Sequence, residues 1–169
     1  MGVWLPALLA AASLGGSPPV TQYPGPTVAF SYPSGWQLQA WQEPTHNFVP
    51  LVGVSTQPLH DPCSVTTTVI RCGFPLSRLN PGGVLGWWAR VGLTISPTSL
   101  VVTNYTIGGR RAVFKVYRRP GHCRQIGGDR TIVVTVMPGD LHFEACLRRP
   151  GLAAHERMIR AMLASTTFP

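Results

Sequence analysis

The chain has 169 residues, of which 44% are hydrophobic, with 18 glycines, 17 prolines, four cysteines and a formal net charge of +8. It is long enough for one domain with its own core, and its scattered glycines and prolines exclude a collagen-like or wholly disordered protein. The charge comes from thirteen arginines and one lysine among many Ala, Gly and Pro residues, a bias typical of GC-rich coding sequences, so it does not identify a nucleic-acid-binding protein.

The first fifteen residues predict a targeting segment. Residues 3–14 are apolar or small and carry no charge, and this run is shorter than the roughly 20 residues that span a bilayer. Small residues at 10–12 suit a cleavage site, although no Lys or Arg precedes the run. Residues 1–15 are therefore expected to be a secretory signal, with the remnant of a longer membrane anchor or an ordinary buried segment as alternatives.

The next stretch, residues 16–26, is polar and rich in Pro and Gly, which predicts an extended linker. A single domain is then expected over residues 27–169. Short apolar or alternating runs bounded by turn residues predict strands in its first part, at 27–36 (running into a turn), 36–41, 48–55, 84–91 and 101–107. Trp87 and Trp88 are adjacent, so on a strand they point to opposite faces, and we expect one in the core and the other exposed.

The last third of the chain has the clearest pattern. Residues 111–119 alternate between apolar and charged, which predicts a strand with one dry face, and residues 131–137 are almost all β-branched, which predicts a central strand buried on both faces. Residues 141–147 predict its hairpin partner, and residues 152–163 have the apolar spacing of an amphipathic helix. The expected fold class is therefore α+β, an antiparallel sheet covered by a C-terminal helix.

Four cysteines in an exported domain predict two disulfides, with three possible pairings. We favour Cys63–Cys72 and Cys123–Cys146, because each links neighbours within one local unit. The chain has no Cys-x-x-Cys pair, so no zinc site, redox pair or other cofactor is predicted. A disulfide-bonded exported chain is expected to be secreted or extracytoplasmic, in contact with the membrane only through its N-terminal segment.

No catalytic residue is predicted. His142 and Glu144 share one face of a strand, but only this fragment of a zinc-deaminase motif is present, and a polar strand face is the simpler interpretation. His60 and Asp61 precede a proline and fit an Asx-type turn. His155 is expected to be a half-buried packing residue of the helix. No phosphate-binding loop, dinucleotide fingerprint or nucleophile elbow occurs.

Three arginine doublets flank strand ends, and with an exposed tryptophan they are weak candidates for binding anionic polymers or sugars. The candidate residues are Arg110, Arg111, Arg118, Arg119, Arg148, Arg149, Trp87 and Trp88. Solvated strand ends are the simpler interpretation.

Two resemblances to known proteins add expectations about fold and function. The segment Phe-Ser-Tyr-Pro-Ser-Gly-Trp at 30–36, the strand start Ile-Gly-Gly-Arg-Arg-Ala at 107–112 and the C-terminal helix resemble the PsbP-like (Mog-type) superfamily. The resemblance implies a PsbP-like sandwich and an accessory or binding role rather than catalysis. The motifs at 123–132, 145–152 and 161–166 resemble secreted proteins of high-GC actinobacteria that have no assigned activity.

The expected function is an exported, non-enzymatic accessory or binding domain of the cell envelope, whose partner is an envelope protein or an anionic polymer. Two alternatives stay open: a basic-surface binder of nucleic acid or anionic lipid, which is not favoured, and an envelope hydrolase using His142, Glu144 or His60.

Overall fold

The computed structural model describes residues 19–41, 48–65, 70–91, 104–118 and 121–169. The predicted targeting segment, residues 1–15, lies outside the described residues. Among those described, no helix is long and apolar enough to cross a membrane.

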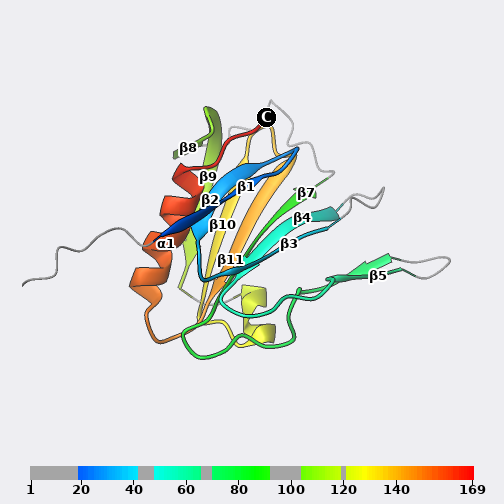
Figure 1. Ribbon diagram of the computed structural model, residues 1–169, viewed down its shortest axis with the longest axis vertical. Coiled ribbons are helices and arrows are strands. Elements are labelled where there is room, and N and C mark those ends of the chain that lie inside the picture. The colour runs from blue at the N-terminus through cyan, green and yellow to red at the C-terminus, as the bar shows by residue number, and fades with distance from the viewer. Residues whose placement is uncertain (1–18, 42–47, 66–69, 92–103, 119–120) are drawn as a thin grey trace, which may run out of the picture.

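Within the described residues, seven antiparallel strands form the main sheet (Figure 1). Their spatial order is β3-β4-β7-β11-β10-β9-β8. Their bounds are β3 Gln37–Ala40, β4 Phe48–Ser55, β7 Val84–Val91, β8 Tyr105–Ile107, β9 Arg110–Tyr117, β10 Arg130–Val136 and β11 Leu141–Leu147. The helix α1, Leu152–Ala164, follows β11. A large antiparallel sheet with a C-terminal helix confirms the predicted α+β class.

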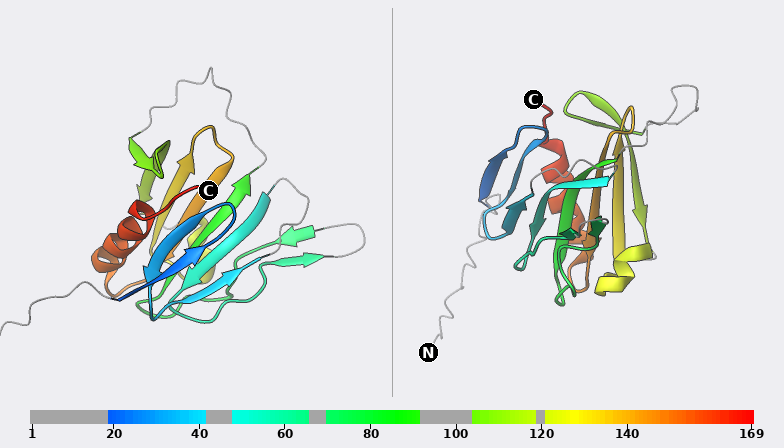
Figure 2. Two further views of the ribbon diagram at one scale, coloured as in Figure 1. Left: turned by 45° about the horizontal axis from the view of Figure 1, so that its top comes forward. Right: turned by 90° about the vertical axis from the view of Figure 1, so that its right-hand side faces the viewer.

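One face of this sheet carries the main core. In register across it lie Phe114, Val134, Phe143, Trp88 and Val52, each opposite the next on neighbouring strands. The helix α1 covers this face together with a hairpin of β1 (Val20–Pro24) and β2 (Ala29–Pro33), as Figure 2 shows from two sides. Because successive strand residues point to opposite faces, the intervening residues line the second face.

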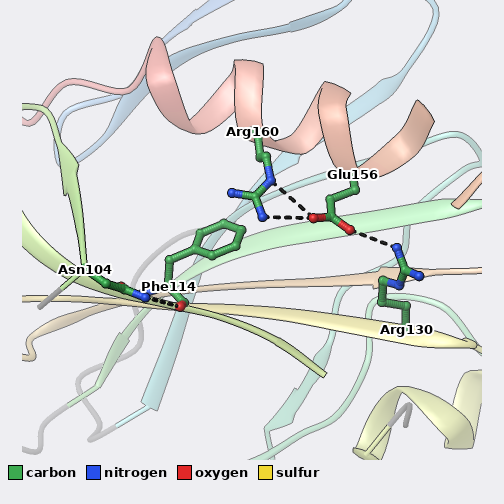
Figure 3. Close-up of polar contacts among 5 residues, drawn as sticks. All are labelled: Asn104, Phe114, Arg130, Glu156 and Arg160. Atoms are coloured by element: carbon green, nitrogen blue, oxygen red, sulfur yellow. Dashed lines mark hydrogen bonds and ion pairs between the residues drawn. The ribbon is translucent and has the colours of Figure 1, made fainter. Parts of the chain in front are cut away.

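The helix is joined to the sheet by charge as well as by apolar packing. Glu156 accepts hydrogen bonds from Arg130 on β10 at 2.8 Å and from Arg160 one helical turn later at 2.9 Å (Figure 3). The Arg160 guanidinium also lies 4.1 Å from the centre of the Phe114 ring on β9. This network, which we call the Glu156 bridge, fixes α1 across β9 and β10.

The predicted linker at residues 16–26 requires a correction, because it contains strand β1. Residues 20–24 pair with 29–33, and the Tyr23 ring lies 5.4 Å from that of Phe30 and packs on the main core. Only Tyr23 of this strand is turned inward, and its other residues are exposed. A five-residue strand with one inward side chain has no readable alternation, so its composition resembled a linker.

The expectation that residues 131–137 are buried on both faces is also wrong. On β10, Ile132, Val134 and Val136 are buried, whereas Val133 and Thr135 are only half-buried. The first three face α1 and the main core, whereas the other two lie on the second face. On this second face, the short 3₁₀ helix η1, Gly121–Ile126, covers part of β10.

A small ribbon lies apart from the main sheet. Strands β5 (Cys63–Val65) and β6 (Ile70–Cys72) pair antiparallel, and their ribbon projects from the body of the molecule (Figure 1). The chain between β6 and β7 then returns to the second face of the sheet, where Leu76 and Leu79 are buried with Leu85 and Trp87.

Candidate functional site: a pocket on the second face of the sheet

A pocket of about 600 Å³ lies on the second face of the sheet, beside η1 and the segment that follows β6. Its floor comes from β7, β10 and β11, where Glu144 lies opposite Trp87 and His142 lies opposite Thr135. The described lining residues are Cys72, Gly73, Phe74, Trp87, Val91, His122, Gln125, Thr135, Gly139, His142 and Glu144. Aromatic and apolar walls with a few polar groups are typical of small-molecule sites.

The disulfide Cys123–Cys146 holds η1 against the sheet. Cys123 belongs to η1 and Cys146 to β11, and both are fully buried. Gly128 permits this close approach, since a Cβ there would lie 3.0 Å from the Cβ and the carbonyl oxygen of Cys123. His122 precedes Cys123 and Glu144 lies two residues before Cys146, so the same bond brings these two side chains together.

His122 and Glu144 form the polar centre of the pocket. The His122 Nε2 lies 2.6 Å from Glu144 Oε1. Glu144 is only 5% exposed, whereas the His122 side chain is 54% exposed. Burial raises the pKa of Glu144, and the charge and hydrogen bond of His122 offset this only in part.

His142 forms a second polar group in the same pocket. Its Nδ1 is hydrogen-bonded to Thr135 Oγ1 on the neighbouring strand at 3.3 Å. Burial lowers the pKa of His142, and the charge of His122 lowers it further. At neutral pH the imidazole of His142 is therefore uncharged.

Phe74 and Trp87 form the aromatic wall. Their ring centres lie 5.6 Å apart at an angle of 86°, and the Phe74 ring also lies 5.6 Å from the imidazole of His122. Such edge-to-face pairs fix the orientation of both rings. Trp87 is 8% exposed, so most of its surface is packed against the protein and only a small part can face the pocket.

Cysteine thiolates do not form a metal site in the described part of this pocket. Among the described residues, Cys123, Glu144 and Cys146 place potential ligand atoms within 4.8 Å of one another. Both sulfurs belong to the disulfide, so neither can bind a metal as a thiolate. The acid and the two imidazoles are the groups available for chemistry.

The structure also places the other residues singled out in the sequence. The disulfides are Cys63–Cys72 and Cys123–Cys146, the two pairs that the sequence favours. His60 is exposed and bonds the carbonyl of Asp61, while Asp61 Oδ1 accepts the backbone N–H of Cys63, which is the predicted Asx-type turn. His60 is not among the pocket residues, so it does not converge with His142 and Glu144.

Only some of the arginine doublets share one rim of the sheet. Arg110 and Arg111 begin β9, whereas Arg118 follows its far end; Arg119 lies outside the described residues. Arg148 and Arg149 follow β11, which runs parallel to β9, so they share the Arg118 end. An eight-residue strand, about 26 Å long, separates the two groups.

Several of these arginines have protein partners. Arg110 forms an ion pair with Asp140 at 2.7 Å, and Arg148 donates to the carbonyl oxygen of Leu79. The expectation of an exposed tryptophan is wrong, because Trp87 and Trp88 are both buried, on opposite faces that each have their own apolar cluster.

His122 and Phe74 are the pocket residues that sequence reasoning missed. Both lie outside regular strands, and neither belongs to a recognisable motif. The signal that could have found His122 is its position beside Cys123, which the favoured disulfide brings next to β11.

No protein-family model, curated protein or solved structure matches this chain. The two disulfides indicate an oxidising, extracytoplasmic environment.

Proposed function

We propose that this chain is an exported, non-enzymatic binding domain of the cell envelope, and that its pocket holds a small organic ligand. The observation that carries this proposal is the convergence of two aromatic rings, a buried carboxylate and two imidazoles around about 600 Å³. This volume lies within the usual range for ligand sites, roughly 300–1,000 Å³, and groups with shifted pKa values often mark functional sites.

Kinship with PsbP-like domains and with actinobacterial secreted proteins is part of the same proposal. It is supported by the antiparallel sheet with a helix across one face. Binding of nucleic acid or anionic lipid has less support, because Arg110 and Arg111 lie at the opposite end of β9 from Arg118. In addition, Arg110 and Arg148 have protein partners.

The proposal is tested by screening a collection of small aromatic and heteroaromatic compounds by thermal unfolding. A ligand at 100 times its Kd stabilises the folded state by about 2.7 kcal/mol. For a chain of this size we expect a rise in Tm of about 5–10 °C.

Paired variants locate the binding. Phe74→Ala removes one pocket wall, whereas Tyr117→Ala removes an aromatic ring that is 45% exposed on β9 and does not line the pocket. We expect Phe74→Ala to weaken binding at least tenfold and Tyr117→Ala to leave it unchanged. Compounds that bind both variants equally well would place the ligand elsewhere and contradict the proposal.

The His122–Glu144 pair favours one second candidate, an envelope hydrolase in which Glu144 orients His122, with His142 in the same pocket. A buried carboxylate that orients an imidazole is a common arrangement in general acid–base catalysis. Mass spectrometry of a bound compound after long incubation separates the two functions. An unaltered compound supports binding, whereas its hydrolysis product would support the enzyme.

A further inference from the structure

The pocket differs from the rest of the chain in its charged side chains. The chain carries 14 lysines and arginines, but none of them is among the described lining residues. The acidic residue of the lining is Glu144, and it is buried. The described lining of the pocket therefore holds one acidic group, paired with His122, and no lysine or arginine.

We propose that the ligand of this pocket is a small organic cation, an amine whose ammonium group pairs with Glu144 and whose apolar part lies against Phe74 and Trp87. This inference rests on the proposed binding function and names its ligand class.

The geometry of Glu144 leaves room for such a partner. Among the described residues, its polar contacts fall on one oxygen: His122 Nε2 and the Cys123 Sγ, at 2.6 and 3.7 Å from Oε1. The Cys123 sulfur is in a disulfide and has no proton to donate. The other oxygen, Oε2, is thus available to a ligand, and a carboxylate shielded from water gains most from a cationic hydrogen-bond donor.

The walls suit a cation as well. An ammonium group over the face of Trp or Phe is attracted by the negative face of the ring. Phe74 and Trp87 meet edge to face at 86° and both line the pocket, so they offer aromatic surface to a bound ligand.

The imidazoles do not oppose this arrangement. His142 faces the pocket from β11, and its burial and the charge of His122 lower its pKa, which favours the uncharged form at neutral pH. His122 is half exposed on η1, so it can share Glu144 with a ligand or turn towards solvent at little cost in buried surface.

Three matched probes test the inference: 2-phenylethylamine, the neutral 2-phenylethanol and the anionic 3-phenylpropanoate. Calorimetry with the full chain at pH 7.5 should show amine binding at least tenfold tighter than that of either other probe. Glu144→Gln should remove this preference and leave the weaker binding of the alcohol unchanged. Glu156→Gln, which removes a carboxylate on α1 outside the pocket, should change neither.

A second measurement needs no variant. Burial raises the pKa of Glu144, and protonation of this carboxylate removes the charge that attracts a cation, so wild-type affinity for the amine should fall as the pH is lowered from 7.5 to 5. Affinity for the alcohol should stay constant.

Equal affinity for the amine and the alcohol, tighter binding of the anion, or a preference that survives Glu144→Gln would each overturn the cation inference. The proposed binding function would stand in those cases, because a ligand would still occupy the pocket. Failure of all three probes, together with failure of the wider compound screen, would overturn both.

Discussion

His142 and Glu144 lie in one pocket, yet burial moves their proton equilibria in opposite directions. The pKa of His142 is lowered by burial and then by His122, so the folded state binds its proton less well than the unfolded state does. The contribution of His142 to stability is therefore present above the unfolded pKa of about 6.5 and is lost as pH falls through the folded pKa. The pKa of Glu144 is raised by burial, so its contribution is present at low pH and is lost as pH rises through the folded pKa.

The lowered pKa of His142 affects how the stability of the fold changes on acidification. We expect His142→Gln, which keeps a hydrogen-bonding group beside Thr135, to reduce the loss of unfolding free energy between pH 7.5 and 5.5. Part of the loss should remain, because burial also lowers the pKa of His155 on α1. Urea titrations at the two pH values measure the difference. His60→Gln, at an exposed site, is the control; the same loss of stability in wild type and His142→Gln would contradict the expectation.

The Glu156 bridge joins the helix α1 to the sheet through hydrogen bonds and ion pairs. Burial raises the pKa of Glu156, but the hydrogen bonds and charges of Arg160 and Arg130 outweigh this and lower it. Its contribution to stability is thus present above the unfolded pKa of about 4.5 and lost as pH falls below it.

We expect Glu156→Gln to cost roughly 1 kcal/mol of unfolding free energy at pH 7, because three charge-assisted hydrogen bonds, one from Arg130 and two from Arg160, are weakened at a partly buried site. On acidification from pH 7 towards pH 3 the cost should shrink, since protonation of wild-type Glu156 removes the same charge. Denaturant unfolding at both pH values checks this, with the exposed Arg157→Gln on the same helix as control. An equal cost at both pH values would show that packing rather than charge is responsible.

The strands and the helix were the most predictable elements, and their residues explain why. Residues 48–55, 84–91 and 141–147 are strands with the predicted bounds. The first two are mostly apolar runs, and in the third His142 and Glu144 fall on one face of a short run bounded by turn residues. The helix extends one residue beyond the predicted 152–163. β1 was missed because only Tyr23 of its five residues is turned inward.

The candidate site was predictable only where it lies on a strand. A spacing of two residues places His142 and Glu144 on one face, and the structure has them there. His122 and Phe74 reach the pocket through a 3₁₀ helix and an irregular segment, whose courses depend on tertiary contacts. Periodicity carries no information about such contacts.

For the whole molecule, the two disulfides constrain different parts. Cys123–Cys146 closes a loop with a sequence separation of 23 between η1 and β11, whereas Cys63–Cys72 closes the projecting β5–β6 ribbon. The first therefore joins the cover of the pocket to its floor.

We expect Cys123→Ala combined with Cys146→Ala to cost about 3 kcal/mol on the chain-entropy model. Amide hydrogen exchange should accelerate in residues 121–126, while β4 and β7 stay protected. Cys63→Ala combined with Cys72→Ala is the matched control, for which accelerated exchange should be confined to the β5–β6 ribbon. Unchanged exchange at 121–126 in the first variant would mean that apolar packing alone holds η1 in place.

Because His122 lies beside Cys123, the redox state of the Cys123–Cys146 pair affects the pocket. Until Cys123 and Cys146 are oxidised, no covalent bond holds η1, and with it the imidazole of His122, against the strand that carries Glu144. Ligand binding by the pocket is therefore expected to be tighter in the oxidised chain than in the reduced one.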